Sequence, residues 1–350
     1  FTECMNKEIN KSIFFIASPL QLLAAQFICK KFDSEREAIA VFYKKDFSSL
    51  ATQSLWDKQI TMSYPRLDPL PGIFGVHRRL LENLLLISKY IYPCNSLYFY
   101  SAVYDTETIN YFISHLRKQL GHKKVSYRIL PDGVISSRRY PISNFQKLLR
   151  RTRDFRYFFS NKLSYTHFSG DRIGSDADFI DHIYVLKSMP HQYNSKKVIE
   201  ISLFENYSRQ KNKLRRSVTP TAIVIGQPLL GFKLMSITDI EKTKNEISEY
   251  LREKKLETIY YKCHPRDSNH TLMKTDYIKL EITSTLEEHF VNTHYDYVIG
   301  VHSSALLLAK QIYSADTQVL SFGWARIKFK NNHEGVDLKN LFMKFKIIFL

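Results

Sequence analysis

The stretch YDYVIGVHSSALL, residues 295–307, decides the fold of this chain. Its apolar positions over 297–299 follow the pattern of a short buried strand, and a helical pattern begins at Ser303. Gly300 lies between the two, where a residue without a side chain lets the backbone come close to a ligand. The stretch therefore predicts a strand that leads directly into a helix N-terminus.

A second stretch, TIYYKCHPR at residues 258–266, also ends in polar groups. Its alternating strand pattern stops at His264, and Pro265 restricts the backbone that follows. In open α/β sheets, ligands bind outside the carboxyl ends of the strands, and a helix N-terminus there attracts anions. Together the two stretches predict a site for a phosphate-bearing ligand. Taken singly, each also fits a plain helix cap or a surface histidine in a turn.

Strand and helix patterns alternate along the rest of the chain. Strands are expected at 12–17, 38–43, 96–100, 125–130, 222–225, 257–261 and 318–322, and 278–282 is either strand or helix. Helices are expected at 20–31, 76–90, 107–120, 238–254, 285–292 and 303–312. This alternation predicts an α/β fold with a mostly parallel sheet in each half.

The length of 350 residues exceeds what one core usually holds, so two domains are expected, with one large doubly wound sheet as the alternative. We place the first domain at 11–209 and the second at 217–330. The polar, basic stretch 211–216 is the expected linker. Residues 331–350 are expected to form a terminal helix or tail that packs back on the first domain or lies on a membrane.

The charge balance favours an anionic partner. Lys and Arg number 51 against 34 Asp and Glu, which gives a net charge of +17. Nucleic acid, anionic lipid, and a phosphorylated or acidic substrate all fit this excess. The four cysteines show no zinc spacing and are typical of reduced thiols, and the sequence shows no membrane-spanning apolar run and no signal peptide. We therefore expect a cytoplasmic protein, either free or peripheral on the inner membrane.

The segment 144–162 interleaves basic and aromatic residues. Such a pattern suits an anionic membrane surface, nucleic-acid stacking, or a solvated basic face. For the membrane interpretation, the expected contacts are made by Lys147, Arg150, Arg151, Arg153 and Arg156.

Two sets of acids in the first half are candidates for chemistry. Asp132 and Gly133 follow the strand expected at 125–130, where a carboxylate can act as a general base, although Asp-Gly is also a common turn. Asp176 and Asp178, with Asp171 and Asp181 nearby, have a spacing that can hold a divalent cation. Gly174 and Ser175 precede them and a helical pattern follows, so we expect these acids to cap a helix instead.

The order acid–glycine, histidine–proline, serine–serine, each at a strand end, resembles the bacterial sialyltransferases that use CMP-sialic acid. These include the lipooligosaccharide sialyltransferases and the capsular polysialyltransferases. The start IFFIASPLQLL, residues 13–23, also resembles the first strand and helix of that group. The resemblance spans Lys11 to Trp324 and implies a GT-B fold, in which two Rossmann-like domains face a central cleft.

The resemblance also implies roles for individual residues. Asp132 would be the general base, and His264 the general acid or a phosphate contact, in an inverting transfer that needs no metal and no other cofactor. The family motif has two consecutive acids before glycine, whereas Pro131 stands at the first of these positions here. If the base belongs to that first position, it is another acid than Asp132. The expected donor-binding residues are Gly226, Gln227, His264, Pro265, Gly300, His302, Ser303 and Ser304, and the expected acceptor-side residues are Ser18, Gly133 and Arg138.

From these observations we expect a sialyltransferase that moves sialic acid from CMP-sialic acid to a hydroxyl of a bacterial surface glycan. The acceptor would be a lipopolysaccharide, an O-antigen or a capsule chain. A second hypothesis is another GT-B glycosyltransferase that uses CMP-Kdo or a UDP-sugar. A third is a basic nucleic-acid-binding α/β protein, although the sequence has no recognised nucleic-acid motif.

Overall fold

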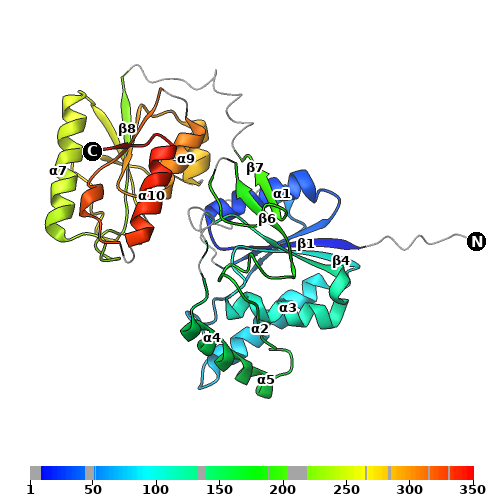
Figure 1. The fold of residues 1–350 in the computed structure, drawn as a ribbon. Coiled ribbons are helices and arrows are strands. Elements are labelled where there is room, and N and C mark those ends of the chain that lie inside the picture. Colours follow the sequence, from blue (N-terminus) through cyan, green and yellow to red (C-terminus); the bar gives the residue numbers. More distant parts are fainter. Residues whose placement is uncertain are drawn as a thin grey trace, which may run out of the picture. The chain divides into compact units, whose positions relative to one another are not determined.

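The computed structural model describes residues 9–43, 51, 53–132, 139, 141–187, 189–203, 219–264, 266–282, 285–313, 316–329 and 332–350. The chain divides into two compact units, Phe1–Leu203 and Phe204–Leu350. Each unit is built on its own parallel sheet (Figure 1). The expected linker at 211–216 lies outside the described residues.

The first unit contains a seven-stranded sheet in the order β3-β2-β1-β4-β5-β6-β7, with all neighbours parallel. The inner strands are apolar on both faces because helices cover both sides, as parallel sheets require. The strands are β1 (Asn10–Ile16), β2 (Glu37–Phe42), β3 (Lys58–Thr61), β4 (Ser96–Ser101), β5 (Val125–Ile129), β6 (Ile180–Leu186) and β7 (Val198–Ile201).

Helices α1 (Pro19–Phe32), α2 (Gly75–Ile91) and α3 (Glu107–Leu120) flank this sheet. Figure 1 shows α1 on one face and the pair α2 and α3 on the other. The core beneath α2 and α3 joins their apolar residues to alternate positions of the central strands, such as Phe15 and Phe99. Short 3-10 turns lie at Gln53–Leu55 and His122–Lys124.

The basic segment forms a helical run of α4 (Asn144–Arg151), a 3-10 turn (Thr152–Asp154) and α5 (Phe155–Phe159). Arg150 is buried, and its Nε lies 2.7 Å from Asp105 Oδ1. Arg153 bonds the same carboxylate at 3.1 Å, and Arg156 Nε lies 3.0 Å from Glu107 Oε1. These three arginines are therefore engaged in ion pairs within the first unit, whereas Lys147 and Arg151 are exposed.

The second unit contains a six-stranded parallel sheet in the order β10-β9-β8-β11-β12-β13. Its strands are β8 (Thr221–Ile225), β9 (Thr258–Lys262), β10 (Ile278–Lys279), β11 (Tyr297–Gly300), β12 (Gln318–Ser321) and β13 (Ile348–Phe349). Its helical elements are α7 (Ile237–Glu253), α8 (Leu286–Asn292), α9 (Ser304–Ile312), a 3-10 turn (Trp324–Arg326) and α10 (Asn332–Lys344). Where we expected a terminal helix or tail, α10 is followed by β13, which pairs with β12.

Serine and threonine residues begin many of the helices, and Ser303, where the sequence predicts a helix start, is one of them. In each case the side-chain oxygen accepts a backbone N–H of the first turn, which satisfies a donor that the helix itself leaves unpaired. These caps are Ser18 for α1, Thr106 for α3, Ser143 for α4, Ser236 for α7, Thr285 for α8 and Ser303 for α9.

The differences from the sequence prediction lie mainly in strands that were not expected. The residues after Asp178 form strand β6, and the helix expected there was wrong. β6 is held between β5 and β7 in the sheet, so long-range pairing outweighs the local helical pattern. The short strands β3, β7 and β13 were not anticipated, because runs of two to four residues carry little periodic signal.

The Asp105 carboxylate anchors the helical run, and we predict that Asp105→Asn destabilises the first unit. Burial raises the pKa of Asp105, but hydrogen bonds from Arg150 and Tyr165 outweigh it and lower the pKa. Breaking such a buried pair leaves Arg150 uncompensated and costs about 3–5 kcal/mol. Urea unfolding measures the loss. The control is Asp154→Asn, since Asp154 makes an exposed pair with His167 and should cost under about 1 kcal/mol.

Candidate functional site

The carboxyl edge of the second sheet gathers the polar groups that the sequence singles out. In the β8–β9 register, Ile225 pairs with Lys262, and in the β8–β11 register, Val224 pairs with Ile299. The residues just beyond these pairs therefore emerge at one edge, with Gln227 directly after β8, which lies between β9 and β11.

Gln227 links the ends of β8 and β11. Its Oε1 accepts the backbone N–H groups of Val301 and His302, at 3.1 and 3.0 Å. Two donors on Oε1 fix the orientation of the amide, so Nε2 donates to His302 Nδ1, 3.1 Å away. The proton of a neutral His302 ring is consequently on Nε2.

His302 is held in the neutral form. Burial lowers its pKa from 6.5 to about 4. Its ring meets Phe329 edge-on, with the centroids 6.1 Å apart. At neutral pH this histidine is therefore a hydrogen-bond donor through Nε2 and not a cation.

His264 has a similar arrangement one strand away. Its Nδ1 accepts the backbone N–H of Arg266 at 3.0 Å, which assigns the ring proton to Nε2. Burial is the main cause of the lowered pKa of His264, and the positive charge of Arg266 lowers this pKa further. The turn is stabilised by Asp267, whose backbone N–H donates to the His264 carbonyl at 3.0 Å and whose Oδ2 accepts from Thr271 at 3.0 and 3.1 Å.

The serine pair lies at the N-terminus of α9. Ser303 is the N-cap, and its Oγ accepts the N–H of Ala305 at 3.2 Å. Ser304, the first helical residue, is exposed. The hydroxyls and the N–H groups of this first turn form the type of surface that binds phosphate oxygens.

The two glycines of the expected donor site differ in how strictly they are required. A Cβ at Gly226 would lie 2.5 Å from the Tyr261 hydroxyl, so only glycine fits between β8 and β9 there. A Cβ at Gly300 would meet Leu306 at 3.4 Å, an ordinary contact. Pro265 lies outside the described residues.

In the first unit, Asp132 and Ser18 come together at the N-terminus of α1. Ser18 Oγ lies 3.4 Å from Asp132 Oδ1 and also accepts the N–H of Gln21 at 3.3 Å. Burial raises the pKa of Asp132, while hydrogen bonds from Gln21 and Ser18 act in the opposite direction. The effect of burial is larger, so the pKa of the Asp132 carboxyl group, which follows β5, is raised above its ordinary value.

Gln21 was not anticipated, although its position three residues after the Ser18 cap could have indicated it. Its Oε1 accepts the N–H of Ala17 at 2.8 Å, and its side chain also bonds Asp132. The expected acceptor-side residues Gly133 and Arg138 lie outside the described residues.

Asp171 and Asp176, two acids of the metal alternative, make contacts within the fold. Asp171 accepts the N–H groups of Gly174 and Ser175 at 2.8 and 3.0 Å, and Asp176 pairs with Arg139. They stabilise the loop before strand β6 and do not cap a helix. Within the described ranges, no group of three or more His, Cys, Asp or Glu side chains is arranged to hold a metal ion.

Comparison with solved structures identifies the class of fold. S. aureus MnaA in its UDP co-structure matches with a TM-score of 0.54 at 8% identity, covering 96% of this chain and 88% of that one. UDP-GlcNAc 2-epimerase from Methanocaldococcus jannaschii matches with a TM-score of 0.50 at 8% identity, covering 97% and 92%. The α/β fold of the GT-B class is thereby confirmed.

The family follows from the sequence itself. A model of the alpha-2,8-polysialyltransferase family matches residues 12–321, and the chain belongs to this family. The protein is accordingly a glycosyltransferase. No curated protein matches the sequence.

The His302 environment predicts an acid-sensitive fold. Because the folded pKa lies below 6.5, the unfolded chain takes up the proton first as the pH falls. The stabilising contribution is complete above about pH 6.5 and declines towards about pH 4, by about 1–2 kcal/mol at about pH 5. We expect His302→Gln to show a smaller loss than the wild type in urea unfolding at about pH 7.5 and about pH 5. His122→Gln, at an exposed site, should leave the loss unchanged.

Proposed function

We propose that the protein is an inverting, metal-independent sialyltransferase that uses CMP-sialic acid. The acceptor is a hydroxyl of a bacterial surface glycan, such as a lipopolysaccharide, an O-antigen or a capsule chain. The observation that carries the proposal is the gathering of Gln227, His264, His302 and the α9 N-terminus at one sheet edge, in a chain of the polysialyltransferase family.

The second unit would bind the donor. The N-terminus of α9 supplies hydroxyls from Ser303 and Ser304 and the backbone N–H groups of its first turn, which suit the CMP phosphate. Gly226 permits the close strand packing that brings Gln227 to the same edge. His302, oriented by Gln227, would offer its Nε2–H to the nucleotide.

The chemical step needs stabilisation of a departing phosphate. The acceptor oxygen attacks the anomeric carbon of sialic acid while the bond from that carbon to the phosphate oxygen breaks, which inverts the configuration. Negative charge grows on the phosphate, and oriented donors stabilise it. His264 would donate from Nε2, and the phosphate charge would raise the histidine pKa as it develops. His264 can thus contact the phosphate or protonate it.

Asp132 would accept the proton of the attacking hydroxyl. A carboxyl group whose pKa is raised towards the working pH is a stronger base than an ordinary aspartate. The hydrogen bonds from Ser18 and Gln21 would hold the Asp132 carboxylate in place at the N-terminus of α1. No step of this scheme calls for a metal ion.

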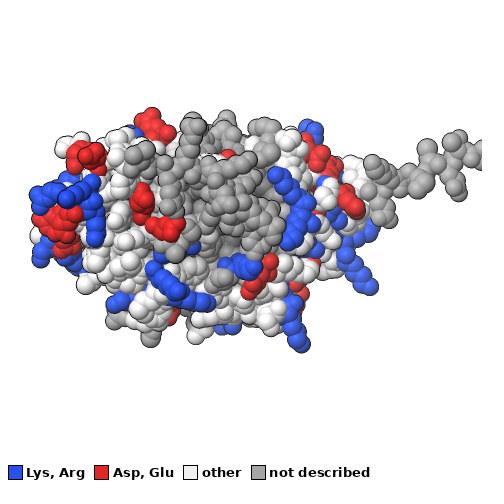
Figure 2. Space-filling model, turned by 90° about the horizontal axis from the view of Figure 1, so that it is seen from above, with Lys and Arg blue, Asp and Glu red and all other residues white. Residues whose placement is uncertain are grey.

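The other two hypotheses require different ligands or a different protein surface. A GT-B enzyme for CMP-Kdo would use the same phosphate contacts, so only a direct donor assay separates it, and a UDP-sugar would bring a diphosphate to the same edge. A nucleic-acid-binding protein needs a continuous basic surface. On the face drawn in Figure 2, the basic and acidic residues of the described part are interspersed, which favours the enzyme.

We predict that Asp132→Asn and His264→Gln each lower the rate of CMP release by about 10²–10⁴-fold, as expected when an acid–base group is lost. The assay uses purified protein, CMP-sialic acid and a galactose-terminated or sialylated acceptor, with EDTA present throughout. His122→Gln and Asp154→Asn, which lie outside the candidate site, are the matched controls and should retain full activity.

Full activity of Asp132→Asn would reassign the base to another acid. Loss of activity in EDTA that added Mg²⁺ restores would overturn the metal-independent mechanism. Turnover of CMP-Kdo or a UDP-sugar without turnover of CMP-sialic acid would establish the second hypothesis instead.

Donor binding should depend on the serine pair. We expect the double variant Ser303→Ala and Ser304→Ala to bind CMP at least about 10–100-fold more weakly, because the loss of even one hydrogen bond to a charged group costs about 1.5–3 kcal/mol net. Calorimetry with CMP and with cytidine measures the effect. If the double variant binds CMP more weakly than the wild type but binds cytidine equally well, the serines contact the phosphate. If the variant and the wild type bind CMP equally well, the serines do not belong to the donor site.

A further inference from the structure

In the helical run of α4 and α5, charged side chains face the rest of the unit and apolar side chains face solvent, which is the reverse of an ordinary surface helix. Three of its four arginines face the first unit, where Arg150 and Arg153 bond Asp105 and Arg156 bonds Glu107. Its apolar side chains lie on the outside. An amphipathic helix of a globular protein normally buries this face. We call the outward residues the apolar stripe: Phe145, Leu148, Leu149, Phe155, Phe158 and Phe159, which are between 46% and 80% exposed.

The apolar stripe is regular. Its first three members have the spacing i, i+3, i+4, and its last three repeat it. The N-terminal end of α2 extends it, because Phe74 lies 5.4 Å from Phe159 between ring centroids and Ile73 beside it is 98% exposed. Contiguous exposed apolar surface of this kind marks an interaction site.

The charges around the apolar stripe are mostly positive. Lys147 and Arg151 on the same helix are exposed, and so is Arg66 nearby. The acid on the helical run, Asp154, is paired with His167 at 3.0 Å. The stripe therefore has a basic rim.

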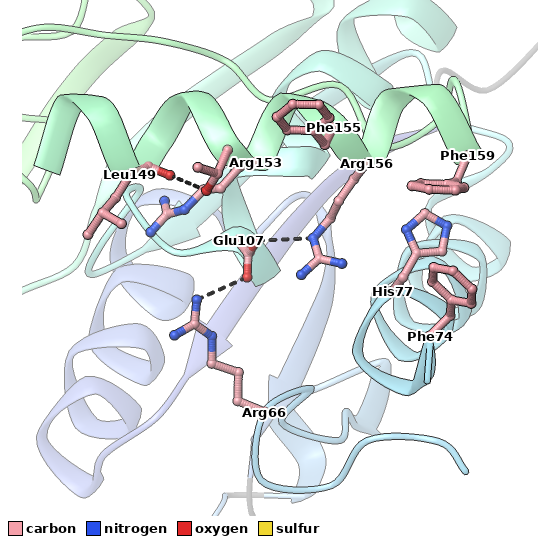
Figure 3. Close-up of a pocket in the computed structure, with 10 residues that line it drawn as sticks. Arg66, Phe74, His77, Glu107, Leu149, Arg153, Phe155, Arg156 and Phe159 are labelled. Carbon is pink, nitrogen blue, oxygen red and sulfur yellow. Dashed lines mark hydrogen bonds and ion pairs between the residues drawn. The ribbon is translucent and has the colours of Figure 1, made fainter. Parts of the chain in front are cut away.

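A pocket of about 520 Å³ opens beside the apolar stripe (Figure 3). Leu149, Phe155 and Phe159 form part of its wall. Within it, Arg66 and Arg156 share the single carboxylate of Glu107, at 3.3 and 3.0 Å. Two guanidinium groups on one carboxylate leave a net positive charge, which suits a phosphate oxygen.

We propose that this face of the first unit docks on a membrane that contains anionic phospholipid. The apolar stripe enters the interface between headgroups and acyl chains, as amphipathic helices with aromatic residues do. Lys147 and Arg151 meet the negative surface, and Arg66 with Arg156 receives a lipid phosphate. In this proposal the contact is peripheral; among the described residues, no helix is long and apolar enough to cross a bilayer.

A membrane fits better than a second copy of the chain. A symmetric dimer through the apolar stripe would bring identical basic rims face to face. Like charges in close contact oppose such an interface. An anionic lipid surface instead complements both the rim and the pocket.

The test is co-sedimentation of the full chain with phosphatidylcholine vesicles, with and without phosphatidylglycerol. We expect binding that requires phosphatidylglycerol and weakens with salt. The triple variant Phe145→Ser, Leu148→Ser and Phe158→Ser should bind at least about tenfold more weakly, since it removes buried apolar area in the interface. Its matched control replaces three exposed apolar residues of the second unit with serine: Phe232, Ile237 and Met343.

A second variant tests the charges. Lys147→Gln with Arg151→Gln should weaken binding to phosphatidylglycerol vesicles about tenfold, and Lys123→Gln with Lys124→Gln should not. Circular dichroism and urea midpoints confirm that the variants fold. The proposal is overturned if the wild-type protein binds vesicles equally well with and without phosphatidylglycerol. It is also overturned if the triple variant binds as tightly as the wild type. A dimer in light scattering that the triple variant abolishes, while vesicles bind neither protein, overturns it as well.

Discussion

Parallel strand pairing is the constraint on which the rest of the structure depends. Every strand of each sheet runs in the same direction, so all carboxyl ends emerge at one edge. Each connection must then cross back over a face of the sheet, and the next helix often starts at the edge where the strand ended. Ser18 before α1 and Ser303 before α9 both cap helices of this kind. The polar groups of both units are concentrated at such edges for this reason.

Gln227 turns one of these edges into an ordered site. By accepting two backbone N–H groups of β11, its amide becomes fixed, and this fixes the tautomer of His302. His264 is oriented in a comparable way by the Arg266 backbone. Both histidines are shifted by burial towards the neutral form, so they offer N–H groups without adding charge before an anion arrives.

The helical run of α4 and α5 shows how burial of charge can determine the exposure of apolar residues. Ion pairs with Asp105 hold Arg150 and Arg153 on the inner face of the helical run. Only one face of a helix can pack against the core of its own unit. The opposite face must then carry the phenylalanines. Such a segment gains from a non-aqueous neighbour, which connects the buried ion pairs of the first unit to its proposed membrane surface.

The sequence alone determined the alternation of strands and helices, the start of a helix at Ser303, and the positions of His264 and Asp132 at strand ends. These depend on local periodicity and on residues adjacent in the chain. The tertiary structure alone decided that 180–186 is a strand, that Gln227 orients His302, and that Arg150 faces inwards. Each of these depends on partners tens of residues away, because pairing and burial are set by the packed sheet and not by neighbours in sequence.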